Sequence, residues 1–118
     1  MSALVFQAIN GDAFRDLKIL VELDLSNNEI TELSPSTFSG NERLQTLTLS
    51  HNSISQLAAF QFPVLKHIKT IDLSYNSLHY IDVQAFGNLG SRYVVVSTYN
   101  ILRLGRTSLR GIYTYSNT

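Results

Sequence analysis

A period of 24 residues runs through the chain and constrains its fold more than any other feature. Aliphatic side chains recur at this step in five columns: Leu20, Leu44 and Ile68; Leu23, Leu47 and Ile71; Leu25, Leu49 and Leu73; Ile30, Ile54 and Leu78; and Leu33, Leu57 and Ile81. Asparagines and phenylalanines form two further columns: Asn28, Asn52, Asn76 and Asn100; and Phe14, Phe38, Phe62 and Phe86. So many columns in phase indicate an internal repeat, in which every 24 residues form one structural unit.

The period divides the 118 residues into four parts. Residues 1–19 fit the second half of a truncated first unit, and residues 20–91 hold three regular units. Residues 92–105 form a degenerate unit, in which Arg92 occupies a leucine column. Residues 106–118 follow no period, and we expect them to form a polar tail.

Each regular unit is interpreted as a short strand, a turn and an irregular return. Leu23 and Leu25 alternate with Asp24, which predicts a strand with two side chains directed inward and one outward. Serine and asparagine at 26–28 favour a turn after this strand. Residues 31–45 show too little helical periodicity for a long helix, so we expect irregular or single-turn structure with Phe38 filling the interior.

The asparagine column has a predicted structural role. A coil this tight leaves inner backbone N–H and C=O groups without partners in a sheet, and a side-chain amide can satisfy both kinds of group. We therefore expect a buried polar ladder of Asn28, Asn52, Asn76 and Asn100 beside the phenylalanine column.

The unit LxxLxLxxNxIxxLxxxxFxxL resembles the leucine-rich repeat of the 24-residue typical class, over roughly residues 6–102. The phrase DLSxN, at 24–28 and again at 72–76, resembles animal cell-surface proteins such as the Toll, chaoptin and Slit families. The resemblance implies an α/β-type solenoid. This would be a fragment of a leucine-rich repeat horseshoe, with a parallel concave sheet and a mostly irregular or short-helical convex side. It also implies protein–protein recognition, usually outside the cell.

Equivalent positions of stacked strands are expected to form rows across the concave face. The predicted rows are Glu22, Thr46, Thr70 and Val94; Asp24, Thr48, Asp72 and Val96; Ser26, Ser50, Ser74 and Thr98; and Asn27, His51, Tyr75 and Tyr99. The face is acidic at the first unit and becomes aromatic and apolar toward the fourth, and tyrosine is favoured at interface anchors. The predicted ligand-binding residues are Glu22, Asp24, Thr46, Thr48, His51, Thr70, Asp72, Tyr75 and Tyr99. The alternative is a plain solvated sheet surface.

Catalysis and metal binding are disfavoured by the same geometry. Ser50 or Ser74 with His51 and Asp72 would supply a nucleophile, a base and an orienting carboxylate. Ser50 and His51 are consecutive, however, and Asp72 would lie ~10 Å away along a neighbouring strand. Ligands from Asp24, His51 and Asp72 are too far apart to share a metal, and the chain has no cysteine. We expect no catalytic residue, no metal and no cofactor.

Charge is unevenly distributed along the chain. Residues 1–91 carry a net charge of −4, from five basic and nine acidic residues, and residues 92–118 carry four arginines and no acid. Arginines interleaved with tyrosines after residue 91 would suit an anionic polymer, but the signal is thin, and a decayed repeat with a disordered end is the favoured interpretation. Nucleic acid is therefore not an expected partner. Neither a signal peptide nor an apolar run of ~18 residues that would cross a membrane is visible.

The functional hypothesis is a non-enzymatic protein-binding module. The chain would be a fragment of a cell-surface or secreted leucine-rich repeat receptor or adhesion protein that holds a protein ligand on its concave face. The alternative is a structural or self-associating repeat segment, or an incomplete gene product, with no ligand of its own. An apolar edge would favour end-to-end self-association: Leu4, Phe6, Ile9 and Phe14.

Overall fold

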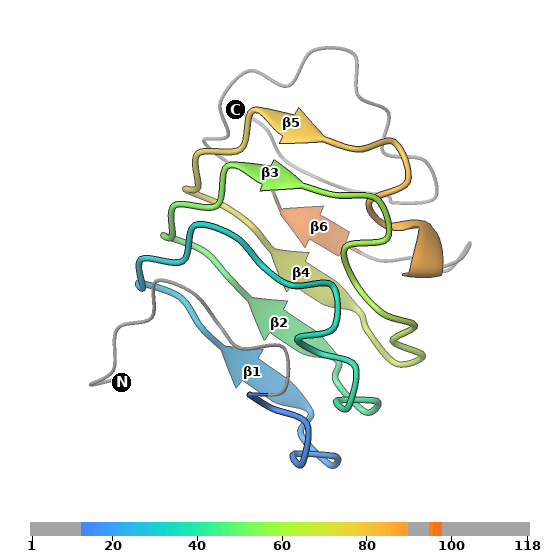
Figure 1. Ribbon diagram of the computed structural model, residues 1–118. Helices are drawn as coiled ribbons and strands as arrows, with labels where there is room; N and C mark the ends of the chain where they lie inside the picture. The colour runs from blue at the N-terminus through green and yellow to red at the C-terminus, as the bar shows by residue number, and fades with distance from the viewer. Residues whose placement is uncertain (1–12, 90–94, 98–118) are drawn as a thin grey trace.

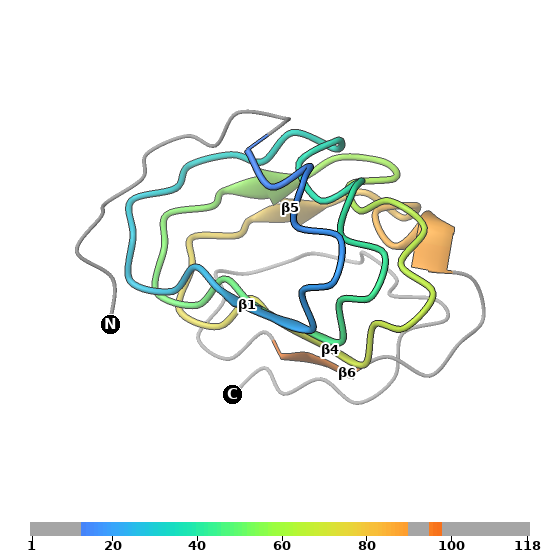
Figure 2. The ribbon, with the colours of Figure 1, turned by 90° about the horizontal axis from the view of Figure 1, so that it is seen from below.

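The computed structural model describes residues 13–89 and 95–97, and it shows a solenoid of stacked coils (Figures 1 and 2). One side of every coil contributes a three-residue strand to a parallel four-stranded sheet of order β1-β2-β4-β6. These strands are β1 (Glu22–Asp24), β2 (Thr46–Thr48), β4 (Thr70–Asp72) and β6 (Val95–Ser97). This is the sheet that the sequence predicts for the concave side, and its outward surface is called the concave face below.

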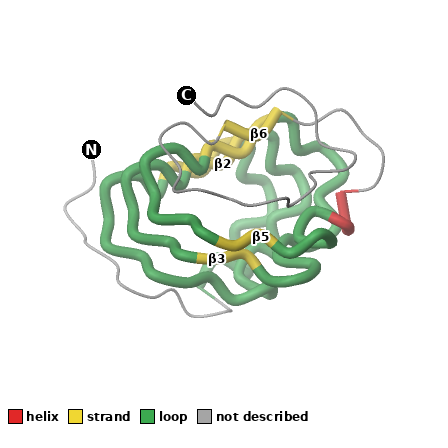
Figure 3. The backbone as a smooth tube through the Cα atoms, turned by 90° about the horizontal axis from the view of Figure 1, so that it is seen from above, coloured by secondary structure: helices red, strands yellow, loops and turns green. Residues whose placement is uncertain are grey.

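A second parallel sheet, which the sequence analysis did not predict, lies on the opposite side of the coils (Figure 3). It consists of β3 (Gln56–Leu57) and β5 (Tyr80–Ile81). Two-residue strands are too short to show the alternation by which a strand is recognised. The rest of this side is formed by turns and by the short 3₁₀ helix η1 (Gly87–Leu89), which agrees with an irregular or short-helical convex side.

The strand register follows the 24-residue period across the first three strands. Thr46 lies opposite both Glu22 of β1 and Thr70 of β4. Between β4 and β6 the step is 25 residues: Val95 lies opposite Thr70, and Ser97 lies opposite Asp72.

The predicted placement of Val94 and Val96 in the outward rows is therefore wrong by one residue: Val96 pairs with the inward position of Ile71. An unchanged step would carry Arg92 into the column of Leu20, Leu44 and Ile68, where an unpaired charge would be buried at high cost.

Stacked phenylalanine rings fill the middle of the solenoid. Phe14 and Phe38 have ring centroids 6.2 Å apart, Phe38 and Phe62 6.5 Å apart, and Phe62 and Phe86 5.7 Å apart. The rings lie within 17° of parallel. The aliphatic columns belong to the same buried core, in which Leu44, Leu47 and Ile71 are completely buried. Each coil thus buries its apolar side chains mainly against the coils before and after it.

Buried asparagines connect the backbones of successive coils. The Nδ2 group of Asn52 donates to the carbonyl of Leu49 in its own coil and to that of Leu25 in the preceding coil, both at 3.0 Å. Its Oδ1 accepts from the backbone N–H of Ile30 at 3.1 Å. Asn76 makes the equivalent bonds one coil later, including one from the Ile54 N–H at 2.9 Å. Asn28 donates to the carbonyl of Leu25 at 2.9 Å, and Asn100 lies outside the described residues.

Candidate functional site

Strands β1, β2 and β4 present two rows of polar side chains on the concave face. The inward position of each strand is aliphatic, so the residues on either side of it face outward. The first row comprises Glu22, Thr46 and Thr70, and the second Asp24, Thr48 and Asp72. The two carboxylates of β1 are exposed, and the other four side chains are half-buried. Six of the nine predicted ligand-binding residues thus lie side by side on one sheet.

A third set of outward residues lies where the strands end. Asn27, His51 and Tyr75 all have left-handed backbone conformations, with φ of 58°, 56° and 58°. The N–H of Asn27 donates to the carbonyl of Ser50, and that of His51 to the carbonyl of Ser74, both at 3.0 Å. These bonds hold successive turns in line, so the three side chains form a row at one edge of the concave face.

His51 and Tyr75 stack on each other in this row. Their ring centroids are 4.5 Å apart and their planes differ by 7°. Both residues are exposed, Tyr75 to 40%. We call this pair the aromatic ledge. The period predicted that the two residues would be neighbours, but the stacking depends on backbone geometry that a repeat pattern does not specify. Tyr99, the predicted continuation of the row, lies outside the described residues.

The carboxylates of Asp24 and Asp72 on this face also stabilise the turns after their strands. Asp24 Oδ1 accepts from the backbone N–H of Ser26 at 2.9 Å and from the Ser26 hydroxyl, and Asp72 Oδ1 accepts from the backbone N–H of Ser74 at 2.9 Å. The hydroxyl and the N–H of Ser26 lower the pKa of Asp24, because both bonds favour the ionised carboxylate. Asp24 therefore presents a negative charge at the edge of the sheet at neutral pH.

The serines of the predicted third row add little to the surface. Ser50 and Ser74 are only 8% and 7% exposed. Asp72 bonds to the N–H of Ser74, whereas the ring of His51 stacks on Tyr75. Within residues 13–89 and 95–97, no three His, Asp or Glu side chains lie close enough together to hold a metal ion. The concave face thus presents carboxylate, hydroxyl and aromatic groups, which are the kinds of group through which protein surfaces bind other proteins.

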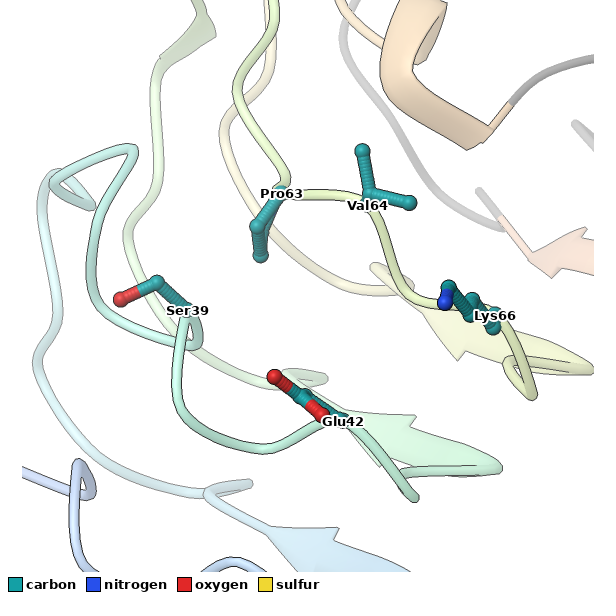
Figure 4. A pocket seen from close by; sticks show the side chains of 5 residues that line it. All are labelled: Ser39, Glu42, Pro63, Val64 and Lys66. Carbon is teal, nitrogen blue, oxygen red and sulfur yellow. The ribbon is translucent and has the colours of Figure 1, made fainter.

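A small hollow lies beside the concave face, between the segments that lead into β2 and β4 (Figure 4). It has a volume of about 270 Å³ and is lined by Ser39, Glu42, Pro63, Val64 and Lys66. None of these residues belongs to the predicted rows. The hollow lies between two neighbouring coils before their strands begin, so it does not form part of the candidate site.

A family model described as leucine rich repeat matches residues 4–54 and 42–92, which together cover most of the chain. The chain belongs to the leucine-rich repeat family. Repeats of this family generally serve as non-enzymatic modules for protein interaction. A comparison with curated proteins finds no match. Within the described part of this leucine-rich repeat protein, no helix is both long and apolar enough to span a lipid bilayer.

Proposed function

We propose that this leucine-rich repeat segment binds a protein ligand through its concave face. The observation that carries the proposal is the alignment of three coils, which places acidic, hydroxyl and aromatic side chains in continuous rows. The aromatic ledge supplies the kind of rigid, partly exposed tyrosine that anchors protein interfaces. Glu22, Asp24 and Asp72 supply charge that would orient the ligand.

The size of the face suits a short ligand segment. Four strands spaced ~4.8 Å apart span ~15–20 Å, whereas a standard interface takes ~800 Å² from each partner. The concave face alone barely reaches that area. We infer that the ligand contributes an extended segment laid across the strands, and that tight binding of a whole protein requires further surface.

A receptor or adhesion role outside the cell is part of the same proposal. Its support is the resemblance of the DLSxN phrase and the phenylalanine column to animal cell-surface repeat proteins. The competing proposal is a structural repeat segment without a ligand of its own. The two proposals differ in one respect: only the first requires the exposed residues of the concave face to affect binding.

Selection from a displayed library of short peptides tests the proposal without a known ligand. Peptides that bind the immobilised chain would be measured on two variants, Tyr75→Ala and Tyr80→Ala. Tyr80 is the matched control, because it is an exposed tyrosine on β5 of the opposite sheet, 49% exposed against 40% for Tyr75. We expect Tyr75→Ala to lower affinity by about tenfold or more, and Tyr80→Ala to leave it unchanged. Selected peptides that bind both variants equally would refute the concave-face proposal.

A further inference from the structure

Positive and negative charges are separated in the described part of the molecule. Every lysine and arginine of residues 13–89 is exposed and lies in a segment that leads into a strand of the concave face: Arg15, Lys18, Arg43, Lys66 and Lys69. The outward rows of β1, β2 and β4 contain none of them and carry three carboxylates, those of Glu22, Asp24 and Asp72. A ligand laid across these three strands therefore meets an acidic surface.

The carboxylates of Asp24 and Asp72 are held in place but not neutralised. Each accepts through Oδ1 from the backbone N–H two residues later, at 2.9 Å, which fixes the side chain beside its strand. Within residues 13–89 and 95–97, neither carboxylate forms an ion pair. Asp72 is half-buried, so water screens its charge less than that of a fully exposed carboxylate. The second oxygen, Oδ2, of each side chain can accept a charge-assisted bond from a cation.

The spacing of these two carboxylates favours one backbone conformation in the ligand. Asp24 and Asp72 lie on either side of Thr48 in the strand register, so two strand spacings, ~10 Å, separate them. A polyproline-II segment returns a side chain to the same side every third residue, after ~9 Å. A β-strand does so every second residue, after ~7 Å, and again after ~13 Å. The polyproline-II repeat is the one that matches both carboxylates.

The aromatic ledge is a second, independent feature that suits such a ligand. Tyr75 follows Asp72 by three residues and stacks on His51 with ring centroids 4.5 Å apart. Proline-rich segments in the polyproline-II conformation dock on aromatic surfaces, and the cations of arginine and lysine are attracted to aromatic ring faces. The ledge and the carboxylates therefore favour the same class of ligand.

We propose that the ligand segment bound by the concave face is cationic and adopts the polyproline-II conformation, with two basic side chains three residues apart that pair with Asp24 and Asp72. The aromatic ledge packs against the part of the segment that lies over β4. Charge complementarity sets the register of the ligand on the strands and speeds its association. This proposal rests on the concave-face function and adds the chemistry of the ligand to it.

Two isosteric variants test the charges. In Asp24→Asn and Asp72→Asn the remaining amide oxygen can still accept from the N–H of Ser26 or Ser74, so the turn is kept while the charge is lost. The probes are the peptides selected from the displayed library on the wild type. We expect basic residues three apart to be enriched in them, and each variant to weaken their binding about five- to tenfold at low ionic strength.

The matched control is Asp82→Asn, which should leave the affinity unchanged. Asp82 is also half-buried and accepts from the backbone N–H two residues later, at 2.8 Å, but it follows β5 on the opposite side of the coils. Peptides that lose affinity in Tyr75→Ala but in neither concave-face asparagine variant would overturn the cationic ligand and leave the concave-face function standing. Peptides that bind Tyr75→Ala and Tyr80→Ala equally would overturn both.

A pair of synthetic peptides tests the spacing. Both are proline-rich decapeptides with two arginines, three residues apart in one and five residues apart in the other, so their charge and composition are the same. NMR titration of the full chain measures both affinities. We expect the first peptide to bind about fivefold more tightly, because only its arginines share one side of the polyproline-II helix. This advantage should disappear in Asp24→Asn and in Asp72→Asn. Equal affinities of the two peptides for the wild type would overturn the proposed pairing.

Discussion

Asn52 shows how one side chain connects two coils. It is 7% exposed, and its amide both donates to and accepts from the backbone of the preceding coil. The accepting oxygen serves the N–H of Ile30, which lies after the bend at Asn27 and Asn28, outside the strands of the sheet. No apolar side chain could make these bonds, which explains why asparagine interrupts an otherwise aliphatic set of columns.

Asn52→Leu should therefore destabilise the protein by ~1–3 kcal/mol, because buried backbone groups would lose their partners. Urea denaturation measures the change in the free energy of unfolding. Gln56→Leu is the matched control, since Gln56 is an exposed amide on β3, and we expect it to change stability by less than ~0.5 kcal/mol. Equal destabilisation by both variants would show that the ladder contributes nothing specific.

Asp24 and Ser26 give a prediction about pH. The bonds from Ser26 lower the pKa of Asp24, so the ionised carboxylate is favoured in the folded state. This contribution to stability is present above the ordinary value of 3.8 and is lost as the pH falls through the lowered value. Ser26→Ala should raise the pKa of Asp24 toward 3.8, as followed by NMR titration of its carboxyl group. Ser53→Ala, an exposed serine in the next coil, should not; an unchanged pKa in Ser26→Ala would contradict the assignment.

Some buried polar residues could not be predicted from the period. Asn41 is completely buried at a position where the other coils carry Leu17, Leu65 and Leu89, and it donates to the carbonyls of Phe14 and Leu17, at 2.9 and 3.1 Å. Gln61 is 4% exposed; it donates to the carbonyl of Leu33 and accepts from the N–H of Ala58, both at 2.8 Å. Each occurs once among the described coils, so no recurring pattern in the sequence indicates it.

At the scale of elements, the stack of phenylalanine rings is the feature that all described coils share. The sequence predicted this column from spacing alone, since an aromatic residue every 24 positions must return to the same place in each coil. The last strand was less predictable. The apolar pattern that fixes register fails at Arg92, so a 25-residue step and a 24-residue step could not be separated before β6 was located.

Phe62→Ala should cost ~3–5 kcal/mol, because it opens a cavity between Phe38 and Phe86. Thermal and urea unfolding measure the loss. Phe60→Ala is the control, since Phe60 is 47% exposed and lies two residues away on the surface; it should cost less than ~1 kcal/mol. A loss for Phe62→Ala that is no larger than that for Phe60→Ala would mean that the stack does not support the solenoid.

The whole molecule is a stack in which neighbouring coils provide most of each other's partners. This arrangement explains why a strong sequence period predicted the architecture and the rows on β1, β2 and β4, since equivalent residues are brought together by translation alone. The same arrangement predicted that His51 and Tyr75 would be neighbours, but it did not predict that their rings stack. The stacking depends on local backbone geometry that a repeat pattern does not specify.

Hydrogen–deuterium exchange at Ile30 and Ile54 tests most directly the central claim that each coil holds the one before it. The Ile30 N–H donates to Asn52 and the Ile54 N–H to Asn76. Both amides should be protected in the wild type. Asn76→Ala should accelerate exchange at Ile54 about tenfold more than at Ile30, and Asn52→Ala should do the reverse. Unprotected amides in the wild type, or equal acceleration of both amides in each variant, would contradict the stacked solenoid and the face built on it.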